Sequence, residues 1–136
     1  MSIDSYCNIW YTNSPYSSYP EAGTKIINGR SRVHAIWVAS GDSGVSAASD
    51  GQTLSCPILL RTASSGDILY EAAFMAPTVT GGRDQNFHTY THYLGGNGIL
   101  FKDEVWYGVR DNDQTGSSSA EPNIFVGIVY SGGVNV

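Results

Sequence analysis

The chain has 136 residues and a net charge of −5 at pH 7; 41% of its residues are hydrophobic and 14% are charged. This length suits a single domain with one core, and the composition excludes a chain that is disordered throughout. The acidic balance argues against nucleic-acid binding, and no apolar run approaches the ~18 residues that a membrane span requires.

Residues 1–24 are predicted to form an extended arm that precedes a domain at 25–136. The first ten residues lack the basic head and apolar stretch of a secretory signal, so export is not expected. Residues 12–23 are rich in Tyr, Ser and Pro, and the prolines disfavour a regular element. Two alternatives stay open: the arm contacts a partner, or it packs back over its own domain. The side chains assigned to partner contact are Tyr6, Trp10, Tyr11, Tyr16 and Tyr19. If they bind a partner, deletion of residues 2–22 is expected to leave the domain folded.

From residue 25 onward, apolar runs alternate with turn signals and predict about eight short strands. An Asn-Gly turn at 28–29 predicts either a hairpin or a bend into one long strand that ends near residue 40. The later predicted strands are 56–63, 67–75, 86–94, 98–101, 105–110 and 123–130. Hairpins are predicted at 64–66 and at 102–104. Because no window carries a helical apolar period, the pattern predicts an all-β, single-domain β-sandwich with jelly-roll or Greek-key connections.

The alternation of side chains along each strand predicts which residues enter the core. Trp37 shares a face with Val33 and is expected to be largely buried. Further expected core residues are Leu69, Phe101 and Val126.

The predicted strand at 123–130 is apolar on both faces. Val126 and Tyr130 lie on one face, and Phe125 and Val129 lie on the other. Such a strand lies between two covered layers, or its second face meets another chain. Together with the aromatic arm, this surface predicts a homo-oligomer, either a dimer or a trimer.

The sequence Gly41-Asp42-Ser43-Gly44 matches the motif around the nucleophilic serine of chymotrypsin-like proteases. A serine nucleophile needs a base within hydrogen-bond reach and a group that orients this base. His34 would lie on the order of 20 Å from Ser43 along an extended strand. We therefore interpret residues 41–44 as a tight turn, assign no catalytic residue and expect no enzymatic activity.

Two polar patterns resemble metal sites. His88 and His92 share one face of a predicted strand but lie ~13 Å apart, so one ion cannot bridge them. Asp111 and Asp113 open a D-x-D-x-x-G pattern typical of a calcium loop, although Pro122 stands where that loop needs Glu. Asp111 and Asp113 are the candidate calcium ligands, with a flexible acidic loop as the alternative. No metal or cofactor is assigned.

The two cysteines, Cys7 and Cys56, are far apart in sequence and have no CxxC partner. A metal site or redox motif built on them is not expected. A single disulfide and two buried thiols both stay open.

The segment GNGILFKDEVWYGVR, residues 96–110, resembles the C-terminal region of small all-β virion proteins of tailed bacteriophages. The strand at 33–40 and the hairpin at 59–74 also resemble segments of these virion proteins in their residue pattern and spacing. The resemblance covers roughly residues 25–130. It implies a non-enzymatic capsid decoration (cement) protein that binds the major capsid protein and stabilises the shell. Such a protein is expected on the capsid surface of the virion after assembly in the host cytoplasm.

A tail- or fibre-associated module that binds a carbohydrate or receptor is the alternative function. Trp10, Trp37 and Trp106 could provide stacking platforms for sugars, with Asp111 and Asp113 as a calcium-assisted site. Aromatic residues that alternate along strands are, however, more often part of a core.

Overall fold

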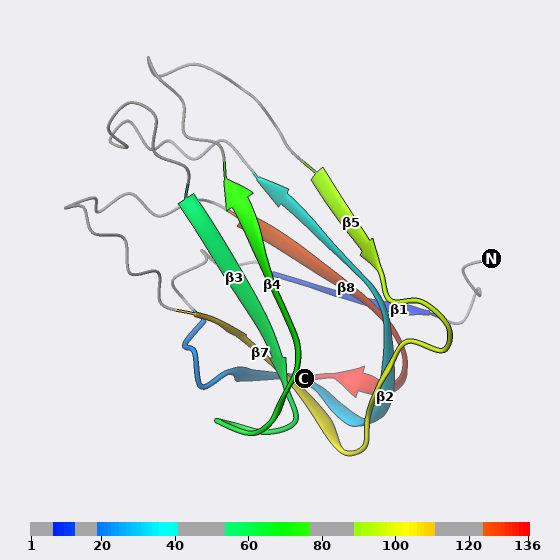
Figure 1. The fold of residues 1–136 in the computed structure, drawn as a ribbon. Helices are drawn as coiled ribbons and strands as arrows, with labels where there is room; N and C mark the ends of the chain where they lie inside the picture. Colours follow the sequence, from blue (N-terminus) through cyan, green and yellow to red (C-terminus); the bar gives the residue numbers. More distant parts are fainter. Residues whose placement is uncertain (1–6, 13–18, 41–53, 77–88, 111–123) are drawn as a thin grey trace, which may run out of the picture.

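The computed structural model describes residues 7–12, 19–40, 54–76, 89–110 and 124–136. Within these ranges the chain forms strands and no helix, and the strands belong to one antiparallel sheet (Figure 1). The strands are β1 (Asn8–Tyr11), β2 (Thr24–Ser40), β3 (Leu54–Arg61), β4 (Ile68–Ala76), β5 (Thr89–Tyr93), β6 (Ile99–Phe101), β7 (Glu104–Val109) and β8 (Ile124–Asn135). The prediction of an all-β protein is confirmed.

Strand β2 is long and sharply bent. One edge pairs with β8 from Ile27 to Ser40, and the other edge pairs in turn with β7, β6 and β5. Gly29 has a φ of +93°, which glycine adopts without strain, and the register against β8 shifts between Asn28 and Ser31. Of the two predicted alternatives, the bend into one long strand is therefore correct. This bend curls the sheet, so that β3 and β4 face β8 across the core (Figure 1).

The turn at Lys102–Asp103 is a corner, and the hairpin predicted there is wrong. Strands β6 and β7 both pair antiparallel with β2, so they run in the same direction, whereas a hairpin would reverse the chain. The backbone N–H of Gly29 donates to the carbonyl oxygen of Asp103 at 2.7 Å, which joins this corner to the bend of β2. The other predicted hairpin is confirmed, because β3 and β4 are antiparallel neighbours.

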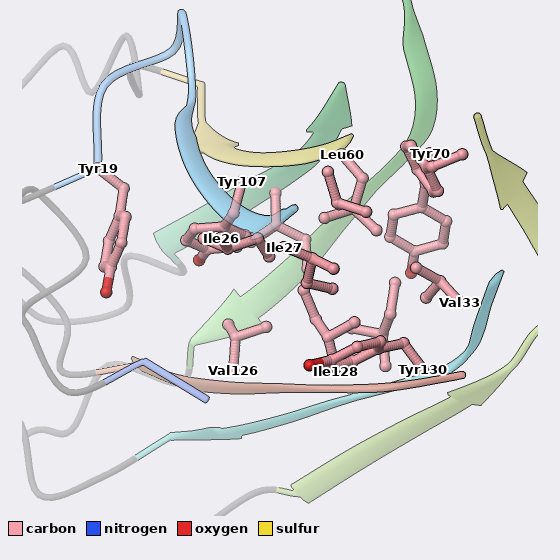
Figure 2. Packing of buried hydrophobic residues seen from close by; sticks show 14 of the residues in the cluster. Tyr19, Ile26, Ile27, Val33, Leu60, Tyr70, Tyr107, Val126, Ile128 and Tyr130 are labelled. Carbon is pink, nitrogen blue, oxygen red and sulfur yellow. The ribbon is translucent and has the colours of Figure 1, made fainter. Parts of the chain in front are cut away.

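The core lies inside the curled sheet (Figure 2). Leu60 and Tyr70 reach into it from β3 and β4, and Val126, Ile128 and Tyr130 reach into it from β8. Full burial of an aliphatic or aromatic side chain contributes about 1.5–3 kcal/mol, so this cluster is the main source of stability. The predicted core positions Phe101 and Val126 are fully buried.

A bulge in β2 explains why Trp37 is not in the core. The register against β8 skips one residue between Val33 and Ala35, so His34 is the extra residue. Beyond the bulge the core-facing positions change phase. Ile36 is fully buried, whereas Trp37 points outward and is half-buried. The predicted burial of Trp37 is therefore wrong.

A second irregularity exposes Leu69. Leu60 pairs with Tyr70 and Arg61 pairs with Ile68, which leaves Leu69 as the extra residue of β4. Tyr70 takes the core position, and Leu69 is 40% exposed. The prediction that Leu69 is buried is also wrong.

The described parts of the N-terminal segment pack against the rest of the chain. Strand β1 pairs with β8, and the buried Thr12 extends this contact. The N–H of Thr12 donates to the carbonyl of Val126, and the N–H of Val126 donates to Thr12 Oγ1, both at 2.9 Å. Trp10 and Tyr19 pack on the ring of Tyr107, with centroid distances of 5.2 and 4.8 Å.

Residues 7–12 and 19–24 therefore pack over their own domain, which was one of the two alternatives predicted for the arm. Deletion of residues 2–22 would remove a strand and two aromatic rings from the core region. We now expect this deletion to destabilise the domain, which corrects the expectation that the domain would stay folded.

Candidate functional site

Several sites predicted from the sequence lie outside the described residues. They are the turn at 41–44 with Ser43, the histidine His88, the calcium candidates Asp111 and Asp113, and the arm residues Tyr6 and Tyr16. The roles predicted for these residues stay predictions. Cys7, which is described, carries a free, half-buried thiol.

The histidines His34 and His92 each contact a hydroxyl group. His34 Nε2 lies 2.7 Å from Ser131 Oγ, which links β2 to β8. His92 Nδ1 lies 2.9 Å from the hydroxyl of Tyr70, which links β5 to β4, and burial raises the pKa of this hydroxyl. In the ranges that the structure describes, no three His, Cys, Asp or Glu residues come together as a metal-binding group.

Three of the aromatic residues assigned to partner contact are described. Tyr19 is 9% exposed and Trp10 is half-buried, and both rings pack on Tyr107 of the same chain. These two rings pack in the core region of their own chain, and their assignment to partner contact stays a prediction. Tyr11 differs, because 64% of it is exposed.

Tyr11 belongs to a surface on the outward side of β1, β8, β2 and β5 (Figure 1). Directly paired residues of neighbouring strands share a face, so the register brings together three rows of side chains. The rows are Ile9–Val129–Ala35–Tyr93, Tyr11–Gly127–Trp37–Thr91, and Phe125–Ala39–Thr89. We call these residues the outer face. The residues that alternate with them on β8 point into the core.

The outer face is apolar, and several of its large side chains are exposed, whereas Ala35 and Gly127 within it are buried. Ile9, Tyr93 and Phe125 are 53%, 66% and 47% exposed. No residue of this face is Asp, Glu, Lys, Arg or His. The water-facing side of an antiparallel sheet normally carries polar residues. The outer face therefore has the composition of a contact surface.

Trp37 lies at the centre of the outer face, against Gly127 of β8. A Cβ atom built on Gly127 would fall among the indole atoms of Trp37. The missing side chain therefore gives the indole a place directly on the backbone of β8. Tyr11 follows on the far side of Gly127 in the same row.

Charged side chains form ion pairs on the outward side of β7, β3 and β4. Arg110 donates from Nε and Nη2 to the two carboxylate oxygens of Glu71, at 3.0 and 3.2 Å, which raises the pKa of the guanidinium. Lys25 Nζ lies 2.9 Å from Glu104 Oε2, and this hydrogen bond lowers the pKa of Glu104. Glu21 also contacts Arg110, at 3.3 Å. The two outward sides of the sheet therefore differ in chemistry.

Sequence reasoning found part of the outer face and missed the rest. The apolar pattern predicted that Phe125 and Val129 lie on the face opposite Val126, and in the structure this second face points away from the core. Ile9 and Tyr93 were missed, since only the pairing register shows that they join the same surface.

No family model matches the chain, and no match was found among curated proteins or solved structures. In the described part of the chain, no helix is long and apolar enough to cross a membrane. A functional surface is therefore inferred from the register, exposure and charge of the outer face.

Proposed function

We propose that this protein is a non-enzymatic structural component of a tailed-bacteriophage virion, in the role of a capsid decoration protein that binds the major capsid protein and stabilises the shell. The outer face supports a structural role, because an exposed, apolar and uncharged surface on a chain of net charge −5 indicates assembly with another polypeptide. Contiguous apolar surfaces of several hundred Å² usually mark a protein or ligand contact. The resemblance of residues 25–130 to small virion proteins points to the major capsid protein as the partner.

The strand order supports a jelly-roll sandwich as the finer description of the fold. One group of four strands runs β1-β8-β2-β5 and uses residues 35–39 of β2 against β5. The other runs β2-β7-β3-β4 and uses residues 24–28 of β2 against β7. Jelly rolls pack two such sheets face to face, and here the two groups share β2, with β6 paired to residues 31–33 of β2 between them. In this arrangement the bend at Gly29 lets β2 serve both sheets.

Cosedimentation tests the capsid proposal. The purified chain is mixed with shells assembled from the major capsid protein of the phage that encodes it, and bound and free protein are separated by centrifugation. We expect saturable binding at a fixed ratio to the capsid subunits. If the protein stays in the supernatant at every concentration, the capsid proposal is wrong.

An active-site probe tests the absence of serine chemistry. We expect a fluorophosphonate probe to leave the chain unlabelled, because the sequence gives Ser43 no base within reach. The measurement is intact-protein mass spectrometry, with a serine protease as the positive control. Stoichiometric labelling of Ser43 would contradict the proposal.

A tail- or fibre-associated carbohydrate-binding module is the second candidate function. It is favoured by the rings of Tyr11, Trp37 and Tyr93, which share the outer face and could stack on sugars. A glycan array separates the two candidates. Specific glycan binding that Tyr93→Ala abolishes would favour this second function, and capsid binding without glycan binding would favour the first.

A further inference from the structure

We propose that a second copy of the same chain covers the outer face, with the two faces packed against each other around a two-fold axis. This inference rests on the proposed structural role and names the first partner of the outer face. The capsid protein would then bind the assembled pair through another surface. A two-fold contact is isologous, so the same residues meet on both sides of it.

The charge distribution favours a second copy as the occupant. Near a two-fold axis, a charged side chain meets its own copy, and like charges that lose water together cost free energy. The outer face carries no such side chain. The ion pairs Arg110–Glu71 and Lys25–Glu104 lie outside the outer face, at β7, β4 and the N-terminal end of β2. The outer faces of two copies can therefore pack against each other without electrostatic repulsion.

The exposed area also fits a contact between copies. Ile9, Tyr11, Tyr93 and Phe125 are each about half to two thirds exposed. For aromatic side chains of ~150–250 Å², and somewhat less for Ile, this exposure amounts to ~450 Å², about half of the ~800 Å² that each partner contributes to a standard stable interface. The rest can come from the partly exposed residues of the face and from its rim.

Large and small residues alternate across the outer face, which suits the packing of one sheet on another. Ala35 separates Val129 from Tyr93, and Ala39 separates Phe125 from Thr89. Packed sheets lie about 10 Å apart with interdigitated side chains. A large ring of one copy can therefore lie against the partly exposed Ala39 of the other.

Sedimentation equilibrium of the full chain tests this proposal. We expect a species of twice the chain mass of 14.6 kDa. Phe125→Asp and Tyr93→Asp each place a carboxylate where it meets its own copy, and each should raise the dissociation constant by at least ~30-fold, the effect of a hot-spot residue. High salt should leave the wild-type dimer intact, because ion pairs do not hold it together.

Leu69→Asp is the matched control, since Leu69 has a comparable exposure on β4, away from the outer face. It should remain a dimer, and circular dichroism should show all three variants folded. A monomeric wild-type protein overturns the proposal, and so does an oligomer that neither Phe125→Asp nor Tyr93→Asp dissociates. A dimer that fails to bind capsid shells would contradict only the capsid proposal, whereas a monomer that binds shells would contradict only the contact between copies.

Discussion

At the scale of single residues, the pair formed by Trp37 and Gly127 shows how the outer face is built. The indole occupies the space that a Cβ atom at position 127 would take. Trp37 is consequently held on the outside of β2 and β8, where it is half-buried. A glycine in the middle of a strand weakens that strand unless another group uses the space, as the indole does here.

Substitution of Gly127 by alanine should displace the indole. We expect Gly127→Ala to lower the free energy of unfolding by ~1–3 kcal/mol, the usual cost of forcing extra atoms into a packed site. Urea denaturation followed by circular dichroism measures this change. Gly95→Ala is the control, because a Cβ atom there meets no other atom within 4 Å. Equal midpoints for the two variants would mean that Trp37 does not depend on Gly127.

The ion pair between Lys25 and Glu104 should make a small contribution to stability that depends on pH. Because the pKa of Glu104 is lowered in the folded state, the pair stabilises the protein above the ordinary pKa of 4.5. This contribution is lost as the pH falls through the lowered folded-state pKa. We expect Glu104→Gln to decrease the urea midpoint slightly at pH 7, with the difference disappearing in acid. A difference that persists below the folded-state pKa would contradict this assignment.

At the scale of elements, β1 is fixed to β8 by more than its own ladder. Thr12, just after β1, exchanges hydrogen bonds with Val126, and its side chain is the acceptor for the N–H of Val126. Trp10, which belongs to β1, packs on Tyr107 of β7. The N-terminal strand therefore belongs to the structural unit, and it also supplies Ile9 and Tyr11 to the outer face.

Loss of the Thr12 hydroxyl tests this attachment. Thr12→Val keeps the shape of the side chain but leaves the buried N–H of Val126 without its acceptor, so we expect a loss of ~1–3 kcal/mol in unfolding free energy. The measurement is urea denaturation, with the exposed Thr24→Val as the control. An unchanged midpoint for Thr12→Val would show that the hydrogen bond contributes nothing to holding β1.

The alternation of apolar residues predicted the class of fold and most of the strands, but not how the strands face the core. Apolar runs and turn residues are local signals, and they located β2 to β7 to within a few residues, whereas β8 continues to Asn135, five residues beyond its predicted end. The bulges at His34 and Leu69 depend on pairing with a distant strand, and each reverses the phase of the side chains beyond it. The rows of the outer face likewise depend on register, so the sequence predicted only the part contributed by Phe125 and Val129.

At the scale of the whole molecule, the outward sides of the curled sheet have different chemistry. The outer face is apolar and uncharged, whereas the side formed by β7, β3 and β4, together with Lys25 of β2, carries ion pairs. A protein that assembles through one side and meets water on the other would show this division. The central claim is therefore that a second copy of this chain covers the outer face.

Site-specific photocrosslinking tests this claim most directly. Benzoylphenylalanine replaces Phe125, which lies on the outer face, or Leu69, which lies away from it, and each purified protein is irradiated and analysed by mass spectrometry. We predict a covalent dimer from position 125, joined to outer-face residues of a second copy, and no dimer from position 69. The absence of any intermolecular product from position 125, or equal yields from the two positions, would contradict the claim.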